Sequence, residues 1–179
     1  MFTIGDSSYA SVSSELHMVI VRPTRKATAR LGVTFQSAPS LTTSKLGDWY
    51  VNLVPTVAGE LFVFVSSPTL LAVAIPSREK DVAALFTLRV ANLLAMIAIP
   101  LPTIERELQH FREIRFAKPV SRSVQASAND IAFHLQMIAE DATPGNPLSL
   151  SEAEIYLSQI PRSPLGFASP LHFAAEMLR

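Results

Sequence analysis

Prolines interrupt this chain at thirteen positions, and they limit where long helices can form. A proline inside a helix removes a backbone hydrogen bond and collides with the preceding turn. Two long proline-free stretches, 77–99 and 120–143, also carry apolar residues at helical spacing. The first repeats Val82, Leu85, Phe86, Leu93, Met96 and Ile97, and the second repeats Ile131, Leu135 and Ile138. We therefore predict the two long helices there.

Strand-like segments lie mostly in the first half of the chain. Residues 19–22, 49–54, 61–65, 70–75 and 113–118 are short apolar runs, several of them β-branched or aromatic. The second, third and fourth runs follow one another at about ten-residue spacing, which is typical of an antiparallel meander. We predict an α+β domain, with a mainly antiparallel sheet of four to five strands packed against helices on one face. The C-terminal third is predicted to be helical.

Polar residues before the apolar stretches predict where helices begin. Thr24, Ser149 and Ser169 are each placed to cap a helix, over 25–31, after 149 and after 169. Ser127 is placed to cap the second long helix, with Asp130 three residues later in a capping-box arrangement. On this interpretation Asp130 stabilises the helix start and pairs with Arg122.

Composition indicates one folded domain. The chain has 179 residues, of which 49% are apolar and 17% charged, the opposite of a disordered composition. Residues 1–17 are Ser-rich and weakly patterned, and His17-Met18 resembles a cloning junction. We interpret 1–17 as an extension, disordered or engineered, and 18–179 as a single α+β domain.

Charge and residue usage exclude several classes of function. Fifteen basic and fifteen acidic residues balance, so no net field attracts nucleic acid or anionic membrane. The absence of cysteine excludes disulfides, thiolate nucleophiles and cysteine metal sites. No stretch predicts a membrane span or signal peptide, and no glycine spacing matches a common phosphate-binding loop. We expect a cytoplasmic protein without cofactor or metal. Low charge also favours self-association or a protein partner.

A basic cluster is the clearest charge feature. Arg22, Arg25, Lys26 and Arg30 occur in a window without acidic residues. Four cations on one strand–helix corner could neutralise phosphates of nucleic acid or of a nucleotide. The alternative is a solvated helix face whose acidic complement lies elsewhere in the fold.

A second candidate site lies in the second long helix. Asp130 and His134 are four residues apart, so they share a helix face, and a carboxylate that orients an imidazole is half of a hydrolase-like relay. Ser123 is the candidate nucleophile. The alternative is a structural network in which Asp130 only stabilises its helix.

The segment Asp48-Trp49-Tyr50-Val51-Asn52-Leu53 is the third candidate. Large amphipathic rings beside a carboxylate suit a ligand pocket or a partner interface, and they make Asp48, Trp49, Tyr50 and Asn52 candidate contacts. The alternative is that the only Trp anchors the core.

Two motifs resemble those of a known family. DWYVNL at 48–53 is similar to a DWYANL-type motif, and RSVQASANDIAFH at 122–134 is similar to an RSVLGSMNDLAFH-type motif. Both occur in a bacterial family catalogued only as a domain of unknown function. The resemblance covers 18–178 and implies a cytoplasmic protein without known activity. It adds Arg122 and Asn129 to the candidate ligand or partner contacts. Ala126 stands where the family usually has a turn-forming glycine.

These observations favour a non-enzymatic interaction module that binds a protein partner or itself. Nucleic-acid or nucleotide binding through the basic cluster stays open as an alternative. A hydrolase-like enzyme using Asp130 and His134 is the second alternative.

Overall fold

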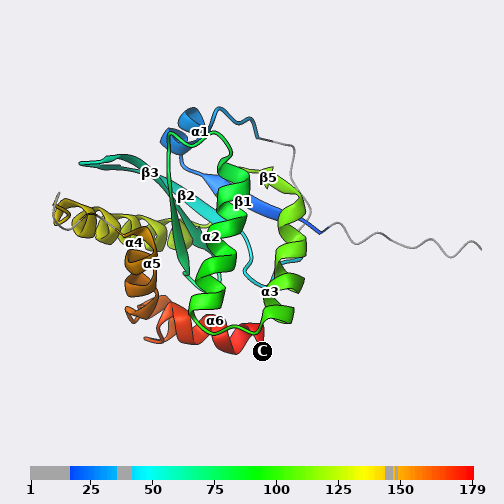
Figure 1. Ribbon diagram of the computed structural model, residues 1–179. Helices are drawn as coiled ribbons and strands as arrows, with labels where there is room; N and C mark the ends of the chain where they lie inside the picture. The colour runs from blue at the N-terminus through cyan, green and yellow to red at the C-terminus, as the bar shows by residue number, and fades with distance from the viewer. Residues whose placement is uncertain (1–16, 36–41, 144–146, 148) are drawn as a thin grey trace, which may run out of the picture.

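The computed structural model describes residues 17–35, 42–143, 147 and 149–179 (Figure 1). Five strands form one sheet in the spatial order β4-β3-β2-β1-β5. Their bounds are β1 Val19–Pro23, β2 Trp49–Thr56, β3 Gly59–Ser66, β4 Ala72–Pro76 and β5 Ile114–Phe116. Six α-helices and two short 3-10 helices accompany the sheet. They are α1 Arg25–Leu31, α2 Val82–Met96, α3 Leu101–Leu108, η1 Gln109–Arg112, α4 Arg122–Glu140, α5 Leu150–Gln159, η2 Ser163–Leu165 and α6 Pro170–Leu178.

The sheet is mixed. The predicted meander is confirmed, because β2, β3 and β4 pair antiparallel in sequence order. By contrast β1 pairs in parallel with β2 and with β5. The α+β class, the number of strands and the helical C-terminal third are all as predicted. The parallel half of the sheet was not predicted.

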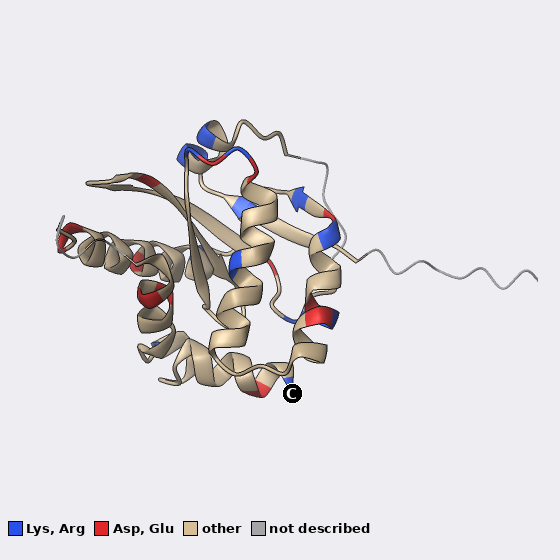
Figure 2. Cartoon of the chain, in the orientation of Figure 1, with Lys and Arg blue, Asp and Glu red and all other residues tan. Residues whose placement is uncertain are grey.

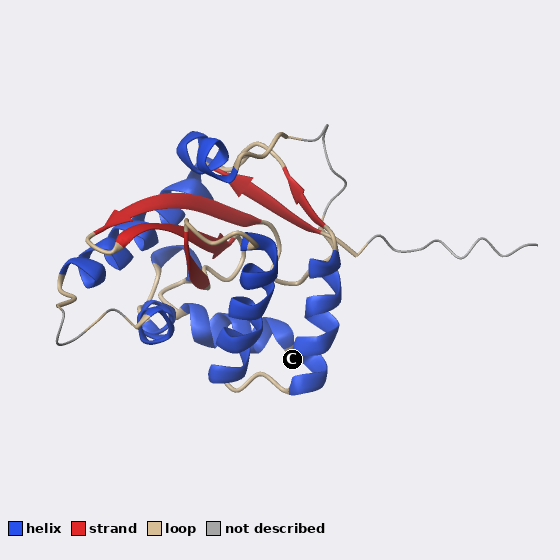
Figure 3. Cartoon of the chain, turned by 45° about the horizontal axis from the view of Figure 1, so that its top comes forward, coloured by secondary structure: helices blue, strands red, loops and turns tan. Residues whose placement is uncertain are grey.

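Helices cover both faces of the sheet, so the expectation that they cover one face is wrong. One core joins the sheet to α1, α2, α3 and α6, with Trp49, Phe64 and Phe86 among its buried side chains. The second core joins the opposite face to α4 and α5, through Tyr50 and Leu135 among others. Figures 1 and 3 show these two helical layers with the sheet between them.

The strand sequences explain why two layers are needed. From Leu61 to Ser66 every residue of β3 is buried, and the same holds from Ala72 to Ile75 in β4. Continuous apolar runs are typical of strands covered on both faces, whereas a strand with one solvated face alternates. The uninterrupted runs therefore required a helical layer on each side.

Three of the four predicted helix caps are confirmed. The side chains of Thr24, Ser149 and Ser169 accept the backbone N–H groups that open α1, α5 and α6. The Ser127 cap is wrong. Helix α4 begins at Arg122, and the side chain of Ser121 accepts the N–H of Val124. Ala126 lies inside α4, so this position holds no turn.

The predicted extension lies almost wholly outside the described residues, since only its last residue, His17, is described. Within the described ranges no helix is both long and apolar enough to cross a membrane.

Candidate functional site

The two family-like motifs meet between β2 and the first turns of α4. The hydroxyl of Tyr50 accepts the backbone N–H of Ser121 at 3.0 Å. Asn52 lies two residues after Tyr50, on the same face of β2, and its side-chain oxygen accepts from the side-chain amide of Gln125 at 3.5 Å. Gln125 also donates to Asn129 at 2.9 Å. A polar network thus joins DWYVNL to one flank of α4.

Asp48 holds a buried arginine at the same end of β2. The Nε of Arg22 donates to the Asp48 carboxylate at 2.5 Å, and its Nη1 donates to the carbonyl of Lys118 at 2.6 Å. Arg22 is only 9% exposed, so its charge is committed inside the protein. Trp49 points to the opposite face, where its ring contacts Phe86 edge to face. Its place among the fully buried side chains is that of a core anchor.

Asp130 and His134 lie on the other flank of α4, and their partner is Arg162. The Nη1 of Arg162 donates to Asp130 at 2.5 Å and lies 3.5 Å from the Nδ1 of His134. The His134 and Asp130 side chains are 3.4 Å apart. Arg162 is 6% exposed, whereas about half of the Asp130 side chain is accessible. The described residues leave its Nε and Nη2 without a hydrogen-bond acceptor.

This geometry corrects the expected roles of Asp130 and Arg122. Asp130 lies in the interior of α4 and does not cap the helix. Arg122 is exposed in the first turn, eight residues away, or about 12 Å along the axis, and Arg162 occupies the place expected of it. Ser123 lies eleven residues before His134, roughly 16 Å along the helix, so the two are not within hydrogen-bond reach.

The structure separates the four residues of the basic cluster. Arg22 is buried and paired with Asp48. Arg30 lies 3.2 Å from the carboxylate of Glu60 and donates to the hydroxyl of Ser77. Arg25 and Lys26 are exposed on α1, at the end of the molecule where Figure 2 shows basic residues. Arg25 and Lys26 therefore remain as exposed cations that pair with no carboxylate in the part of the chain that the structure describes.

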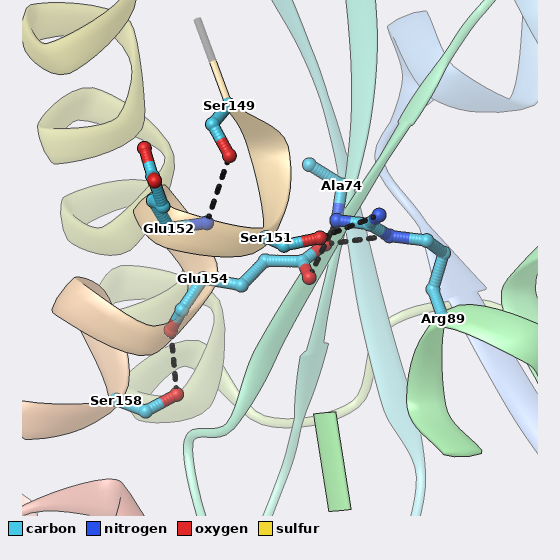
Figure 4. Close-up of polar contacts among 7 residues, drawn as sticks. All are labelled: Ala74, Arg89, Ser149, Ser151, Glu152, Glu154 and Ser158. Carbon is cyan, nitrogen blue, oxygen red and sulfur yellow. Dashed lines mark hydrogen bonds and ion pairs between the residues drawn. The ribbon is translucent and has the colours of Figure 1, made fainter. Parts of the chain in front are cut away.

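A further ion pair, which the sequence analysis did not predict, lies at the β4 edge of the sheet (Figure 4). Glu154 of α5 is 1% exposed and accepts the backbone N–H of Ala74 at 2.7 Å. Arg89 of α2 donates to the same oxygen at 3.1 Å and pairs with the other at 2.6 Å. Burial raises the pKa of Glu154, and the hydrogen bonds and charge of Arg89 and Ala74 partly oppose this rise.

Of the two missed arginines, only Arg89 left a trace in the sequence. Arg89 is the only charged residue between Asp81 and Glu105, and a lone charge in so apolar a stretch indicates an internal partner. Arg162 stands alone in a Pro- and Ser-rich turn, where nothing in its neighbours indicates burial. Among the described side chains, no three His, Asp or Glu residues are grouped to hold a metal ion.

Comparison with known proteins supports the resemblance carried by the two motifs. No curated protein and no solved structure matches the chain. The model of one family, described as a domain of unknown function, DUF6933, matches residues 20–173. This range contains both motifs, all of β1 except its first residue, and every element from α1 to η2. The chain belongs to the DUF6933 family.

Proposed function

We propose that this protein is a non-enzymatic interaction module that associates with a second copy of itself through the outer face of α2. The observation that carries the proposal is the exposure of large apolar side chains on a helix without an outward charge. Leu88 is 53% exposed and Met96 is 45% exposed. The only charged residue of α2, Arg89, turns inward to Glu154.

A helix that is apolar all round is usually buried. The remaining outward positions of α2 include Ala84, Asn92 and Ala95, which add no charge. Charged residues are depleted at the centres of protein interfaces, and the outer face of α2 likewise presents no charged side chain. The uncharged face supports self-association, because two copies can bring it together without like-charge repulsion.

The surface next to α2 can enlarge the interface. Met96, Ile155 and Tyr156 line a shallow groove between α2 and α5, with Glu152 and Gln159 at its polar rim. Tyr156 is 56% exposed, and tyrosine is over-represented among the residues that dominate binding energy. A stable dimer buries about 800 Å² per subunit, more than one helix face supplies, so we expect α5 to take part.

The alternative functions have weaker support. Phosphate binding would rest on Arg25 and Lys26, since Arg22 and Arg30 have internal or neighbouring carboxylate partners. A hydrolase using Asp130 and His134 would need a nucleophile close to the imidazole, and Ser123 lies about three helical turns away. We place the protein in the cytoplasm, as the sequence predicts.

The test is the molar mass in solution, measured by light scattering across a concentration series. We expect a dimer at tens of micromolar, and we expect Leu88→Glu to weaken it at least about tenfold without changing the circular dichroism spectrum. Phe133→Glu is the matched control, because Phe133 is 58% exposed on the outer face of α4. A strict monomer, or equal weakening by both variants, would contradict the proposal.

A further inference from the structure

A pocket with a mainly apolar lining and a polar mouth open to solvent lies between α1, α2 and strands β1, β3 and β5, away from the proposed dimer face. Its volume is about 270 Å³. Phe62 and Phe64 of β3, Phe86 of α2 and Phe116 of β5 contribute four aromatic rings to its walls. Val21, Phe62, Phe64 and Phe86 are at most 2% exposed, so they form a closely packed floor of the pocket at the edge of the first core.

The topology of the sheet independently marks this position. Strands β1 and β5 are adjacent and parallel. The chain leaves β1 into α1, which packs in the first core, and leaves β5 into α4, which packs in the second core on the opposite face. Ligands of open α/β sheets bind outside the carboxyl ends of adjacent parallel strands whose following helices diverge, and β1 and β5 share this feature although α4 leads to no further strand in the described part of the chain. Val21 and Phe116, near the ends of β1 and β5, both line the cavity. Figure 3 shows the two strands running in the same direction toward this end.

The chemistry of the walls favours an aromatic ligand. Phe64 and Phe86 are stacked with ring centroids 4.3 Å apart, and Phe62 meets Phe64 edge to face at 6.5 Å. Protein interiors are normally close-packed, and a water molecule on the phenylalanine floor of the pocket finds few of the two to four polar partners it needs. A cavity of roughly half this volume accepts a single benzene ring. The space therefore suits a bicyclic aromatic molecule.

The mouth of the cavity carries charges of both signs. Arg30 is paired with Glu60, and Asp81 accepts the backbone N–H of Ala84 at the start of α2. Lys80 and Glu79 are adjacent exposed residues of opposite charge. A charged ligand would find no dominant opposite charge here, whereas a neutral molecule with one hydrogen-bonding group finds donors and acceptors. We propose that this cavity is a binding site for a small, uncharged, bicyclic aromatic molecule, held with its ring among the phenylalanines and its polar atom at the mouth.

Indole is the probe, and binding is followed by calorimetry and by NMR of the full chain. We expect one site per chain with a dissociation constant of the order of 0.1–1 mM. Nuclear Overhauser effects should connect indole protons to the methyl groups of Val21, Leu31 and Val82, which line the cavity. Indole-3-acetate and tryptamine carry opposite charges on the same ring, and each should bind at least about tenfold more weakly, because a charge without a dedicated partner is costly to desolvate.

Cavity-filling variants complete the test. Val82→Trp and Val33→Trp place a ring into the cavity from two different walls, and each should weaken indole binding at least about tenfold. The matched control is Val57→Trp, at a position 83% exposed between β2 and β3, which should bind indole like the parent. If Val82→Trp does not fold, Val33→Trp decides the outcome. No binding at millimolar indole, unchanged binding by a folded filled variant, or tighter binding of either charged analogue would overturn the proposal.

Discussion

Two of the arginine–carboxylate pairs, Arg89–Glu154 and Arg162–Asp130, bury opposite partners. At the β4 edge the carboxylate of Glu154 is 1% exposed, while the side chain of Arg89 is 19% exposed. In the pair under α4 the arginine is the buried partner, because the side chain of Arg162 is 7% exposed and that of Asp130 is 55% exposed. In each pair, the buried member depends on the other for compensation of its charge.

The two pairs also fasten different parts of the fold. Arg89 comes from the helical layer on one face of the sheet and Glu154 from the layer on the other, so their contact closes the β4 edge. Glu154 also accepts the N–H of Ala74, which would otherwise be an unpaired donor on an edge strand. Arg162 and Asp130 join the turn before η2 to α4. The loss of stability on substitution should therefore depend on whether the charge that remains without its partner is buried or exposed.

The largest expected effect is that of Glu154→Ala. It leaves the Arg89 guanidinium and the Ala74 N–H without their carboxylate, and we expect the free energy of unfolding to fall by about 3–5 kcal/mol. Glu154→Gln keeps an acceptor oxygen and should be less destabilising. Urea unfolding at equal protein concentration is the measurement, because dimerisation changes apparent stability. Equal losses in the two variants would show that the acceptor at Ala74 contributes little.

Asp130→Ala should have the next largest effect. Among the described residues Asp130 is the only carboxylate paired with the buried Arg162. We expect its removal to lower the free energy of unfolding by about 2 kcal/mol, less than at Glu154 because Asp130 is half exposed. His134→Ala is the control and should behave as a small loss of packing. Thermal unfolding of both variants is the measurement. If Asp130→Ala melts at the parental temperature, the pair is dispensable for stability, and selection of Asp130 for function becomes the better explanation.

Ser121→Ala distinguishes a pairing role of Asp130 from a capping role. Because Ser121 caps α4, this substitution should cost about 1 kcal/mol. Ser127→Ala removes the residue that the sequence pattern favoured as the cap, and it should change stability little. The melting temperatures of the two variants are the measurement. A larger loss in Ser127→Ala than in Ser121→Ala would place the start of α4 at Ser127.

The smallest expected effect is a pH dependence of stability that arises from Glu154 and its pairing with Arg89. Because burial raises the pKa of Glu154 above its usual 4.5, the folded protein holds this proton more tightly than the unfolded chain. Stability contributed by Glu154 is then largest below about pH 4.5 and declines as the pH rises through the folded pKa. The melting temperature of the parent minus that of Glu154→Gln should therefore fall between about pH 4 and about pH 7. A difference that rises over this range would contradict the sign.

Local features of this fold were predictable because they depend on neighbours in the sequence. Thr24, Ser149 and Ser169 cap helices as expected, since a side-chain oxygen needs only the N–H groups two or three residues ahead. The meander of β2, β3 and β4 follows from apolar runs separated by short turns. The Ser127 cap failed because Ser121 offers the same side chain earlier in the chain. The backbone N–H of Ser121 also donates to the hydroxyl of Tyr50, a contact over 71 residues that no local pattern indicates.

The candidate site was predictable in its residues but not in its arrangement. Tyr50, Asn52 and residues of α4 were all identified as candidates from the sequence. Asn129 and Asp130 nevertheless project from different flanks of α4, because successive helical residues are about 100° apart. Neither Arg162 nor Glu154 was identified, since each is defined by a partner at least 32 residues away.

The amino-acid sequence by itself determined the α+β class, the order of the elements and most helix starts, because periodicity and caps act over a few residues. Only the tertiary structure decided the parallel pairing of β1, the helical layer on each face, the ion pairs of Arg22, Arg89 and Arg162, and the aromatic cavity. These features depend on which distant surfaces pack together, and the free energy of that packing comes from apolar area and charge compensation that no local pattern records.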